Sequence, residues 1–322
     1  MSQPALRRGT EFTVPAGFAD AVAAAAQPAT SDDLLDVEGV RIGEFAGYQA
    51  LLVYTPAASA AIALHGGHLL SYVPAGQPDV LWLSPRAKAP PDAIRGGVPV
   101  VWPYFGRQGQ TDAVPSHGFA RTVRWTIEHV SRTDEGAVAV SLALPHFPDL
   151  GLELRMELVV GDTLEQSLVT RNTRDETVTF TQALHSYFGV SDVQQVRVEG
   201  LDGVAYLDKN DGYVRHLQRG DWTLRDPRDP GRSDRIYNAA GGSYVLDDPA
   251  ARRRLHVDVT GGATLVIWNP GEAAAARMTD VGDGWRGFLC LEAANAGGEV
   301  VVLEPGGTHR LTQRVRSVPD AG

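Results

Sequence analysis

The sequence predicts an all-β protein, built as one large antiparallel β-sandwich. From residue 34 onward, apolar residues recur at every second position in many short runs, which is the period of a half-buried strand. The 35 glycines and 20 prolines of the chain suit frequent turns better than long helices. No segment repeats with a period of roughly 20–50 residues, which argues against a propeller or a solenoid. Many short strands with few helices favour a sandwich.

The N-terminal part of the chain differs from the rest. Glu11 and Asp20 interrupt the apolar stretch that a secretory signal would need, so we expect no targeting signal there. We expect an N-terminal extension over residues 1–33, partly disordered or with a short helix over 18–26. A single domain over residues 34–318 follows, since no Gly/Ser linker divides it.

The predicted strands share an alternating or short apolar pattern bounded by turn residues. They cover residues 137–144, 152–160, 164–170, 178–184, 195–199, 243–246, 255–259, 264–268, 287–292 and 300–304. Clusters of Gly, Pro, Asn and Asp, as at 226–231, separate them. Only one further segment, 271–278, has a helical pattern.

The composition excludes several classes of protein. The 29 lysines and arginines against 39 aspartates and glutamates give a formal charge of −10, which disfavours nucleic-acid binding. No apolar run approaches the roughly 18 residues of a membrane span. The single cysteine, Cys290, rules out an intrachain disulfide framework and a cysteine zinc site, so we expect a cytoplasmic protein. Lysine occurs only at positions 88 and 209, and an arginine cluster could still bind a small phosphate.

The segment 94–125 is the densest in chemistry-bearing residues. Its glycines and prolines exclude a long helix or a central strand. It carries Arg95, Arg121 and His117 beside three large aromatic residues, a combination suited to a ligand mouth, because arginines hold anions and aromatic rings stack on sugars. An ordinary surface loop with salt bridges is the alternative at this point.

Two further residues could act in acid–base chemistry. His185 falls late in a predicted strand, and histidine is the commonest general acid or base near neutral pH. Glu292 follows the apolar run 288–291, where desolvation would raise its pKa. The alternatives are a structural histidine and a glutamate at an exposed strand end. His65 and His68 form an HxxH pattern, which on a strand points them to opposite faces, so we expect no metal there.

Read together, these segments resemble the hexose-6-phosphate mutarotases, or glucose-6-phosphate 1-epimerases, of the aldose 1-epimerase superfamily. The combination of RGGxPxxWPxFG with HGFAR, LHxYF and a late LEAxN is specific. The matching pieces are GHLLSY (67–72), VLWLSP (80–85), IRGGVPVVWPYFG (94–106), PSHGFAR (115–121), LHSYF (184–188), VEGLDGVAYLDK (198–209), DRIY (234–237), VIWNP (266–270) and CLEAAN (290–295). The resemblance implies a sandwich of the galactose mutarotase-like type that works without a cofactor.

The resemblance also assigns the catalytic pair. His185 of LHxYF matches the family's catalytic acid, and Glu292 of the late strand matches its catalytic base. Opening an aldopyranose requires a base for the C1 hydroxyl proton and an acid for the ring oxygen, so we expect a carboxylate and a protonated imidazole facing each other across the sugar.

The remaining matched residues are substrate contacts by resemblance. Arg95 and Arg121 contact the substrate, Asp234 before RIY is a further contact, and His117 hydrogen-bonds the sugar. One departure is Ser116, where some members have glutamine; its shorter side chain implies a weaker or water-mediated contact.

The sequence therefore predicts an isomerase that interconverts the α and β anomers of a hexose 6-phosphate, most simply glucose 6-phosphate. Two alternatives stay open: a catalytically silent carbohydrate-binding protein on the same fold, and a mutarotase of an unphosphorylated aldose. We expect a small-molecule sugar phosphate as partner, with no nucleic acid and no membrane. The sequence does not fix the oligomeric state, and we favour a monomer.

Overall fold

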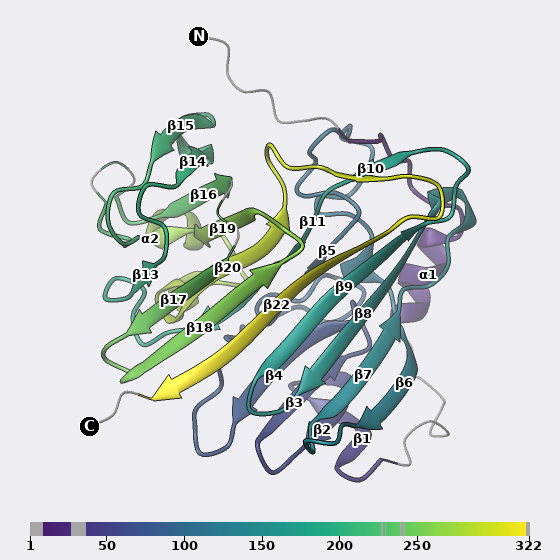
Figure 1. Cartoon of the computed structure of the whole chain (residues 1–322), viewed down its shortest axis with the longest axis horizontal. Helices are drawn as coiled ribbons and strands as arrows, with labels where there is room; N and C mark the ends of the chain where they lie inside the picture. Colours follow the sequence, from purple (N-terminus) through teal and green to yellow (C-terminus); the bar gives the residue numbers. More distant parts are fainter. Residues whose placement is uncertain are drawn as a thin grey trace.

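The computed structural model of the chain describes residues 9–26, 37–226, 228, 230–238, 240 and 242–319. Residues 1–8 and 27–33 of the predicted extension lie outside the described residues, and its predicted boundary with the domain stays a prediction. The described residues form two eight-stranded sheets, one four-stranded sheet and one two-stranded sheet, all antiparallel (Figure 1). The predicted all-β antiparallel fold is confirmed.

The first eight-stranded sheet, here called the front sheet, crosses the near side of the molecule (Figure 1). In spatial order it comprises β13 (Arg197–Glu199), β17 (Ser243–Asp248), β18 (Arg253–Thr260), β22 (Thr308–Pro319), β9 (Leu164–Asn172), β8 (Leu152–Val160), β7 (Val138–Ala143) and β6 (Thr126–Arg132). In β8 every second residue is buried, as the alternating sequence predicts.

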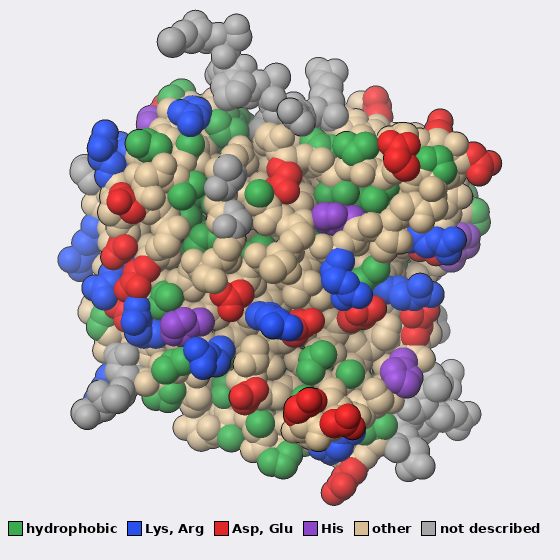
Figure 2. Space-filling model, viewed as in Figure 1, with side chains coloured by type: hydrophobic (Ala, Val, Ile, Leu, Met, Phe, Trp, Pro, Cys, Tyr) green, Lys and Arg blue, Asp and Glu red, His purple; other side chains and the backbone are tan. Residues whose placement is uncertain are grey.

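The outer face of the front sheet carries cross-strand ion pairs. Arg155 binds Glu128 at 2.7 Å, and Arg314 binds Glu165 at 2.6 Å. Figure 2 accordingly shows basic and acidic side chains interspersed over this face of the molecule. Such exposed pairs contribute little to stability, and their mixture of signs leaves no strongly charged patch on the side in view.

The second eight-stranded sheet, here called the site sheet, lies behind the front sheet. It comprises β15 (Val214–Leu217), β14 (Ala205–Asp208), β16 (Ser233–Asn238), β19 (Thr264–Asn269), β20 (Phe288–Asn295), β11 (Gln182–Leu184) and β5 (Val100–Val101), with β12 (Tyr187–Gly189) also paired to β20. All eight residues of β20 are buried, because the strand is flanked on both edges and covered on both faces.

The smaller elements complete the layers. They are β1 (Val40–Phe45), β2 (Tyr48–Tyr54), β3 (Ala58–Ala63) and β4 (His68–Pro74) of the four-stranded sheet, β10 (Val178–Phe180) and β21 (Val301–Leu303) of the two-stranded sheet, α1 (Phe18–Ala25), α2 (Gly271–Ala275), and the 3₁₀ turns η1 (Ala120–Thr122), η2 (Pro148–Leu150), η3 (Lys209–Asp211) and η4 (Gly282–Gly287). Strand β3 contacts β8, and β20 contacts β22, so the front sheet packs on the four-stranded sheet and on the site sheet. One large apolar cluster fills the space between them.

The structure refines the predicted elements. Each predicted strand overlaps an observed strand, but the run 178–184 divides at Thr181 into β10 and β11. The longest strand, β22, was not predicted. The two predicted helices begin where expected and end earlier, at Ala25 and Ala275. Within the described residues, no helix combines the length and the apolar character needed to cross a bilayer.

Residues 9–26 pack against the segment that follows β5. The Gln110 side chain accepts from the N–H of Phe12 at 2.7 Å and donates to the carbonyl of Thr10 at 2.9 Å. Phe12 is buried 6.2 Å from the Tyr104 ring, and Phe18 lies edge-on to Phe119 at 5.1 Å. The N-terminal segment thus fixes the outer side of the segment that carries HGFAR.

Candidate active site

The floor of the candidate site follows from strand register in the site sheet. Glu292 of β20 is paired with Val266 of β19, which is paired with Ile236 of β16. Directly paired residues of an antiparallel sheet point to the same face. One face of the sheet therefore carries Glu292 beside Val266 and Ile236. Two residues further along the strands, the same face carries Trp268 with Asp234 beside it.

Register also explains the position of His185. Strands β11 and β12 both pair with β20, through Leu184 opposite Ala293 and Tyr187 opposite Cys290. The two pairings follow one register, which puts His185 opposite Glu292. The backbone N–H of His185 donates instead to the carbonyl of Pro99 at 3.0 Å.

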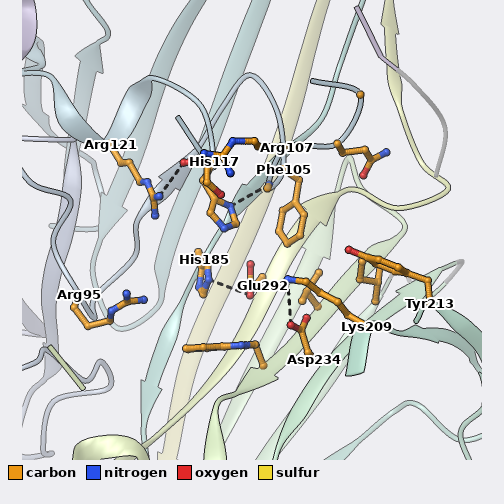
Figure 3. Close-up of a pocket in the computed structure, with 17 residues that line it drawn as sticks. Arg95, Phe105, Arg107, His117, Arg121, His185, Lys209, Tyr213, Asp234 and Glu292 are labelled. Atoms are coloured by element: carbon orange, nitrogen blue, oxygen red, sulfur yellow. Dashed lines mark hydrogen bonds and ion pairs between the residues drawn. The ribbon is translucent and has the colours of Figure 1, made fainter. Parts of the chain in front are cut away.

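The two side chains are neighbours on the floor of the site. His185 Nε2 lies 3.4 Å from Glu292 Oε1, and Glu292 is only 1% exposed (Figure 3). From the sequence we expected His185 and Glu292 to face each other across a sugar. In the structure they instead lie side by side on adjacent strands. The imidazole stacks on the Tyr187 ring, with centroids 4.9 Å apart and planes 9° apart, which fixes its orientation.

Burial shifts the pKa values of this pair in opposite directions. Burial raises the pKa of Glu292 well above its usual value, and the charge of Asp234 adds to the increase. Burial, together with the charges of Arg95 and Arg121, lowers the pKa of His185 to about 3. In the ligand-free site, a proton on the pair therefore resides on Glu292.

Arg95 enters the site from the segment before β5. Its Nε donates to Asp280 Oδ2 at 3.0 Å, and its Nη1 donates to the Tyr187 hydroxyl at 2.8 Å. Asp280 belongs to the segment between α2 and η4, and the Ser84 hydroxyl donates to its carbonyl at 2.6 Å. Two hydrogen bonds thus hold the guanidinium toward His185 (Figure 3).

Arg121 lies on η1, on the same side of His185 as Arg95 (Figure 3). Its Nη2 donates to the carbonyl of Ser116 at 2.9 Å. Within the described part of the chain it forms no ion pair with a carboxylate, and burial lowers its pKa to about 10. An arginine that is desolvated without a counter-ion is a ready anion ligand. Ser116 itself lines the cavity and also holds Arg121 through its backbone.

His117 is fixed as a neutral donor. Its Nδ1 accepts from the N–H of Gly106 at 3.2 Å, so the hydrogen of a neutral ring resides on Nε2. Burial holds the pKa of His117 well below its usual value, and Arg121 adds to this effect. Its backbone has a φ of 67°, within the left-handed region.

Asp234 and Lys209 form the opposite wall. Lys209 Nζ lies 3.2 Å from Asp234 Oδ2 (Figure 3). Burial raises the pKa of Asp234, and the lysine opposes that rise. A carboxylate and an ammonium held together offer both an acceptor and a donor to sugar hydroxyls.

These side chains line one cavity of about 580 Å³. All seven residues predicted as site residues contribute to its wall: Arg95, Ser116, His117, Arg121, His185, Asp234 and Glu292. The lining holds four cationic side chains (Arg95, Arg107, Arg121 and Lys209) and two carboxyl groups, those of Asp234 and Glu292. Arg95 is paired with Asp280 and Lys209 with Asp234, so Arg121 is left without a carboxylate partner in the described chain. This cationic lining contrasts with the net charge of −10 of the whole chain.

Sequence reasoning missed several residues of the site. Lys209 lies at the end of a recognised motif, and its rarity as one of two lysines was the available signal. Trp268 and Tyr187 also lie within motifs, and only strand register reveals their place beside His185. Asp280 lies outside the matched motifs, and nothing in the sequence pointed to it.

The HxxH histidines have structural roles near the site. His68 Nε2 lies 2.7 Å from the carbonyl of Gly96, and His65 Nε2 lies 2.8 Å from the carbonyl of Asp92. Within the described residues, no group of three or more histidines, cysteines or carboxylates is placed to hold a metal ion.

The arrangement suits proton transfer to and from a sugar held in a charged cavity. A carboxylate and an imidazole side by side can act on two oxygens bonded to one carbon, such as the C1 hydroxyl and the ring oxygen of a pyranose. The fold and this pair define a carbohydrate-processing β-sandwich of the mutarotase type.

Comparison with known proteins gives the family. The chain matches the aldose 1-epimerase family model over residues 50–316, and it belongs to that family; it is an isomerase. It is 36% identical over 275 residues to the "Putative glucose-6-phosphate 1-epimerase" of Escherichia coli, covering 83% of this chain and 89% of that protein. A protein of the same name from Cenchrus ciliaris is 32% identical over 282 residues, covering 81% of this chain and 82% of that one.

Solved structures support the same fold. The crystal structure of a "putative mutarotase" from Salmonella typhimurium superposes with a TM-score of 0.79 at 29% identity, covering 89% of this chain and 96% of that one. The galactose mutarotase related enzyme of Lactobacillus acidophilus has a TM-score of 0.64 at 17% identity, covering 84% of this chain and 98% of that chain, a likeness of fold.

Proposed function

We propose that this chain interconverts the α and β anomers of a hexose 6-phosphate, with glucose 6-phosphate as the first substrate to test. The observation that carries the proposal is the Glu292–His185 pair on the floor of a cavity lined by four cationic side chains. The names of the curated relatives point to the same substrate.

The reaction needs two proton transfers at one end of the sugar. Glu292, as carboxylate, removes the proton of the C1 hydroxyl, while His185, as imidazolium, protonates the ring oxygen and the bond from C1 to that oxygen breaks. The open aldehyde turns about the C1–C2 bond and recloses with the two proton transfers reversed. Each proton transfer typically contributes about 10²–10⁴-fold to the rate.

The cationic residues serve as the anchor of the phosphate group. Arg121 has a desolvated guanidinium without a carboxylate partner in the described chain, and Arg95 is held beside it by Asp280 and Tyr187. A phosphate dianion can accept charge-assisted hydrogen bonds from both. Binding energy at this remote group orients C1 over the acid–base pair.

The remaining wall residues suit the sugar ring. Asp234 and Lys209 offer an acceptor and donors to hydroxyl groups, and His117 offers its Nε2 hydrogen. Trp268, edge-on to His185 at 5.9 Å, provides an apolar surface for the pyranose.

Anomer-exchange NMR tests the proposal. Magnetisation transfer between the α and β C1 protons is measured for glucose 6-phosphate, glucose and galactose, with and without the protein. We expect the largest enzyme-dependent rate for glucose 6-phosphate. Binding without any acceleration would support the silent carbohydrate-binding protein, and a preference for a free sugar would support the mutarotase of unphosphorylated aldoses.

A further inference from the structure

The cavity contains a charge imbalance beside its acid–base pair. Four cationic side chains face two carboxylates in its wall, and Arg121 has no acidic partner in the described chain. We propose that the substrate's phosphate dianion, by pairing with Arg95 and Arg121, transfers the proton of the catalytic pair from Glu292 to His185 and so brings the site into its active form. This inference rests on the proposed function and adds to it a reason for selectivity.

The surroundings of His185 are dominated by positive charge. Arg95 and Arg121 line both the main cavity and a second one of about 210 Å³, and His185 lines both cavities as well. The ionisable groups packed around the pair are Arg95, His117, Arg121, Tyr187, His68 of β4, Lys209 of η3, Asp234 of β16, Asp280, and Cys290 and Glu292 of β20. Of the carboxyl groups other than Glu292, Asp234 is held by Lys209 at 3.2 Å and Asp280 by Arg95 at 3.0 Å, which leaves Arg121 without a carboxylate partner in the described chain.

The ligand-free site has its proton in the wrong place for ring opening. The reaction needs glutamate as base and imidazolium as acid. Burial raises the pKa of Glu292, while burial and the two arginines lower the pKa of His185. The pair therefore holds a carboxylic acid beside a neutral imidazole until something changes the local charge.

A dianion supplies the missing charge. It balances the charge of Arg121, which no carboxylate of the described chain pairs, and adds a second anion beside Arg95. Once Arg95 and Arg121 are neutralised, their field no longer opposes a positive charge on His185. The proton then moves from Glu292 Oε1 to His185 Nε2, atoms that are 3.4 Å apart. No other acid, base or reactant is needed, because the pair keeps one proton throughout.

This mechanism predicts which kinetic parameter should be impaired for a sugar without phosphate. Glucose without phosphate can occupy the floor and the Asp234 wall, yet it leaves Arg121 without an anionic partner and Arg95 with Asp280 alone. Its defect should therefore appear in kcat, since the bound complex keeps the inactive proton arrangement. Loss of the orientation that the phosphate provides would also lower kcat, so the protonation of His185 in the two complexes decides between the two explanations.

The direct test uses ligands that cannot react. 1,5-Anhydroglucitol 6-phosphate has no C1 hydroxyl, so it binds without ring opening, and 1,5-anhydroglucitol is its phosphate-free match. The imidazole ¹⁵N signals of His185, identified by their loss in His185→Asn, are recorded with each ligand at saturation. We expect imidazolium only with the phosphorylated ligand, and a rise of about tenfold or more in the imidazolium-to-imidazole ratio, equivalent to one pKa unit.

Two variants sharpen this test. Arg121→Gln removes one of the charges that oppose imidazolium, so the difference between the two ligands should shrink. Arg314→Gln, on the exposed face of the front sheet, should leave that difference unchanged. A neutral His185 with both ligands, or an equal imidazolium content with both, would overturn the inference.

A kinetic test separates this inference from the proposed function. Inorganic phosphite, added as a dianion to enzyme and free glucose, should raise the enzyme-dependent anomer exchange about tenfold or more, after subtraction of the rate with Glu292→Gln. Rapid turnover of glucose 6-phosphate with no phosphite activation and a neutral His185 would overturn the inference and leave the proposed function standing. Absence of glucose 6-phosphate turnover would overturn both.

Discussion

Arg121 provides the sharpest test of the phosphate assignment. Its Nη2 is occupied by the carbonyl of Ser116, which leaves Nη1 and Nε for a ligand. A hydrogen bond to a charged group contributes about 1.5–3 kcal/mol. At about 1.4 kcal/mol per factor of ten, Arg121→Gln should lower kcat/KM for glucose 6-phosphate about 10- to 150-fold. Any activity on free glucose should fall much less, because that sugar has no phosphate group to lose its contact.

The stability of the same variant gives an independent readout. In the empty protein Arg121 is desolvated and has no carboxylate partner in the described chain, so removing its charge relieves a cost. That relief offsets the lost bond to Ser116, and we expect the free energy of unfolding to fall by no more than about 0.5 kcal/mol.

The assay for this prediction is anomer-exchange NMR on both sugars, combined with urea denaturation. The matched control is Arg314→Gln, which removes an exposed arginine paired with Glu165 and should change neither efficiency. If Arg121→Gln lowers exchange of both sugars equally, or destabilises the fold by several kcal/mol, the arginine is structural and the reasoning fails.

Three further predictions concern the pair and its support. Glu292→Gln and His185→Asn should each lower exchange about 100-fold or more with an unchanged circular dichroism spectrum, and near-normal exchange in either folded variant would contradict its role. The pH profile of kcat/KM should be bell-shaped, because the active pair holds one proton. The acid limb lies below pH 6.5, where His185, whose pKa is lowered, binds a proton in addition to the one already held by the pair. The alkaline limb lies above pH 4.5, where Glu292, whose pKa is raised, loses the proton of the pair. A profile with no alkaline limb at any pH above 4.5 at which the protein stays folded would exclude a pair that must keep one proton. Asp280→Asn should lower kcat/KM for glucose 6-phosphate about tenfold by freeing Arg95, as one weakened charged hydrogen bond predicts. Asp283→Asn, at an exposed position of η4, should have no effect, and equal results for the two variants would remove Asp280 from the anchor.

The sequence predicted the strands best where one face of a sheet meets the core. The run 152–160 alternates over most of its length and matches β8 at both ends. Strand β22 escaped prediction because charged and polar residues, such as Arg314 and Arg316, dominate a strand whose core-facing positions are few. Pairing with β18 and β9 on its two edges makes it a strand, and such long-range partners are invisible in the local pattern.

The candidate site was predictable in its residues and not in its geometry. Motif resemblance brought together residues that are far apart in sequence, and all seven line one cavity; their roles remain proposals. The contact of Asp280 with Arg95 joins positions 185 residues apart, and no spacing rule could reveal it. The placement of His185 beside Glu292 depends on two strands that share one register against β20.

Glu292 illustrates why burial and chemistry are linked in this fold. From the sequence alone, Glu292 could have been at an exposed strand end. In the structure, β20 continues through Ala293 and Ala294 to Asn295. Ala293 is paired on both edges, with Leu184 of β11 and Leu265 of β19, so the strand cannot end at the carboxylate. A carboxylate held in the middle of a doubly flanked strand cannot move out to water, and this confinement is the cause of its raised pKa. The same side chain at the end of a loop would ionise freely, and the active proton arrangement would then need no phosphate to create it. The central position of β20 is therefore what makes the charge of the ligand able to control the pair.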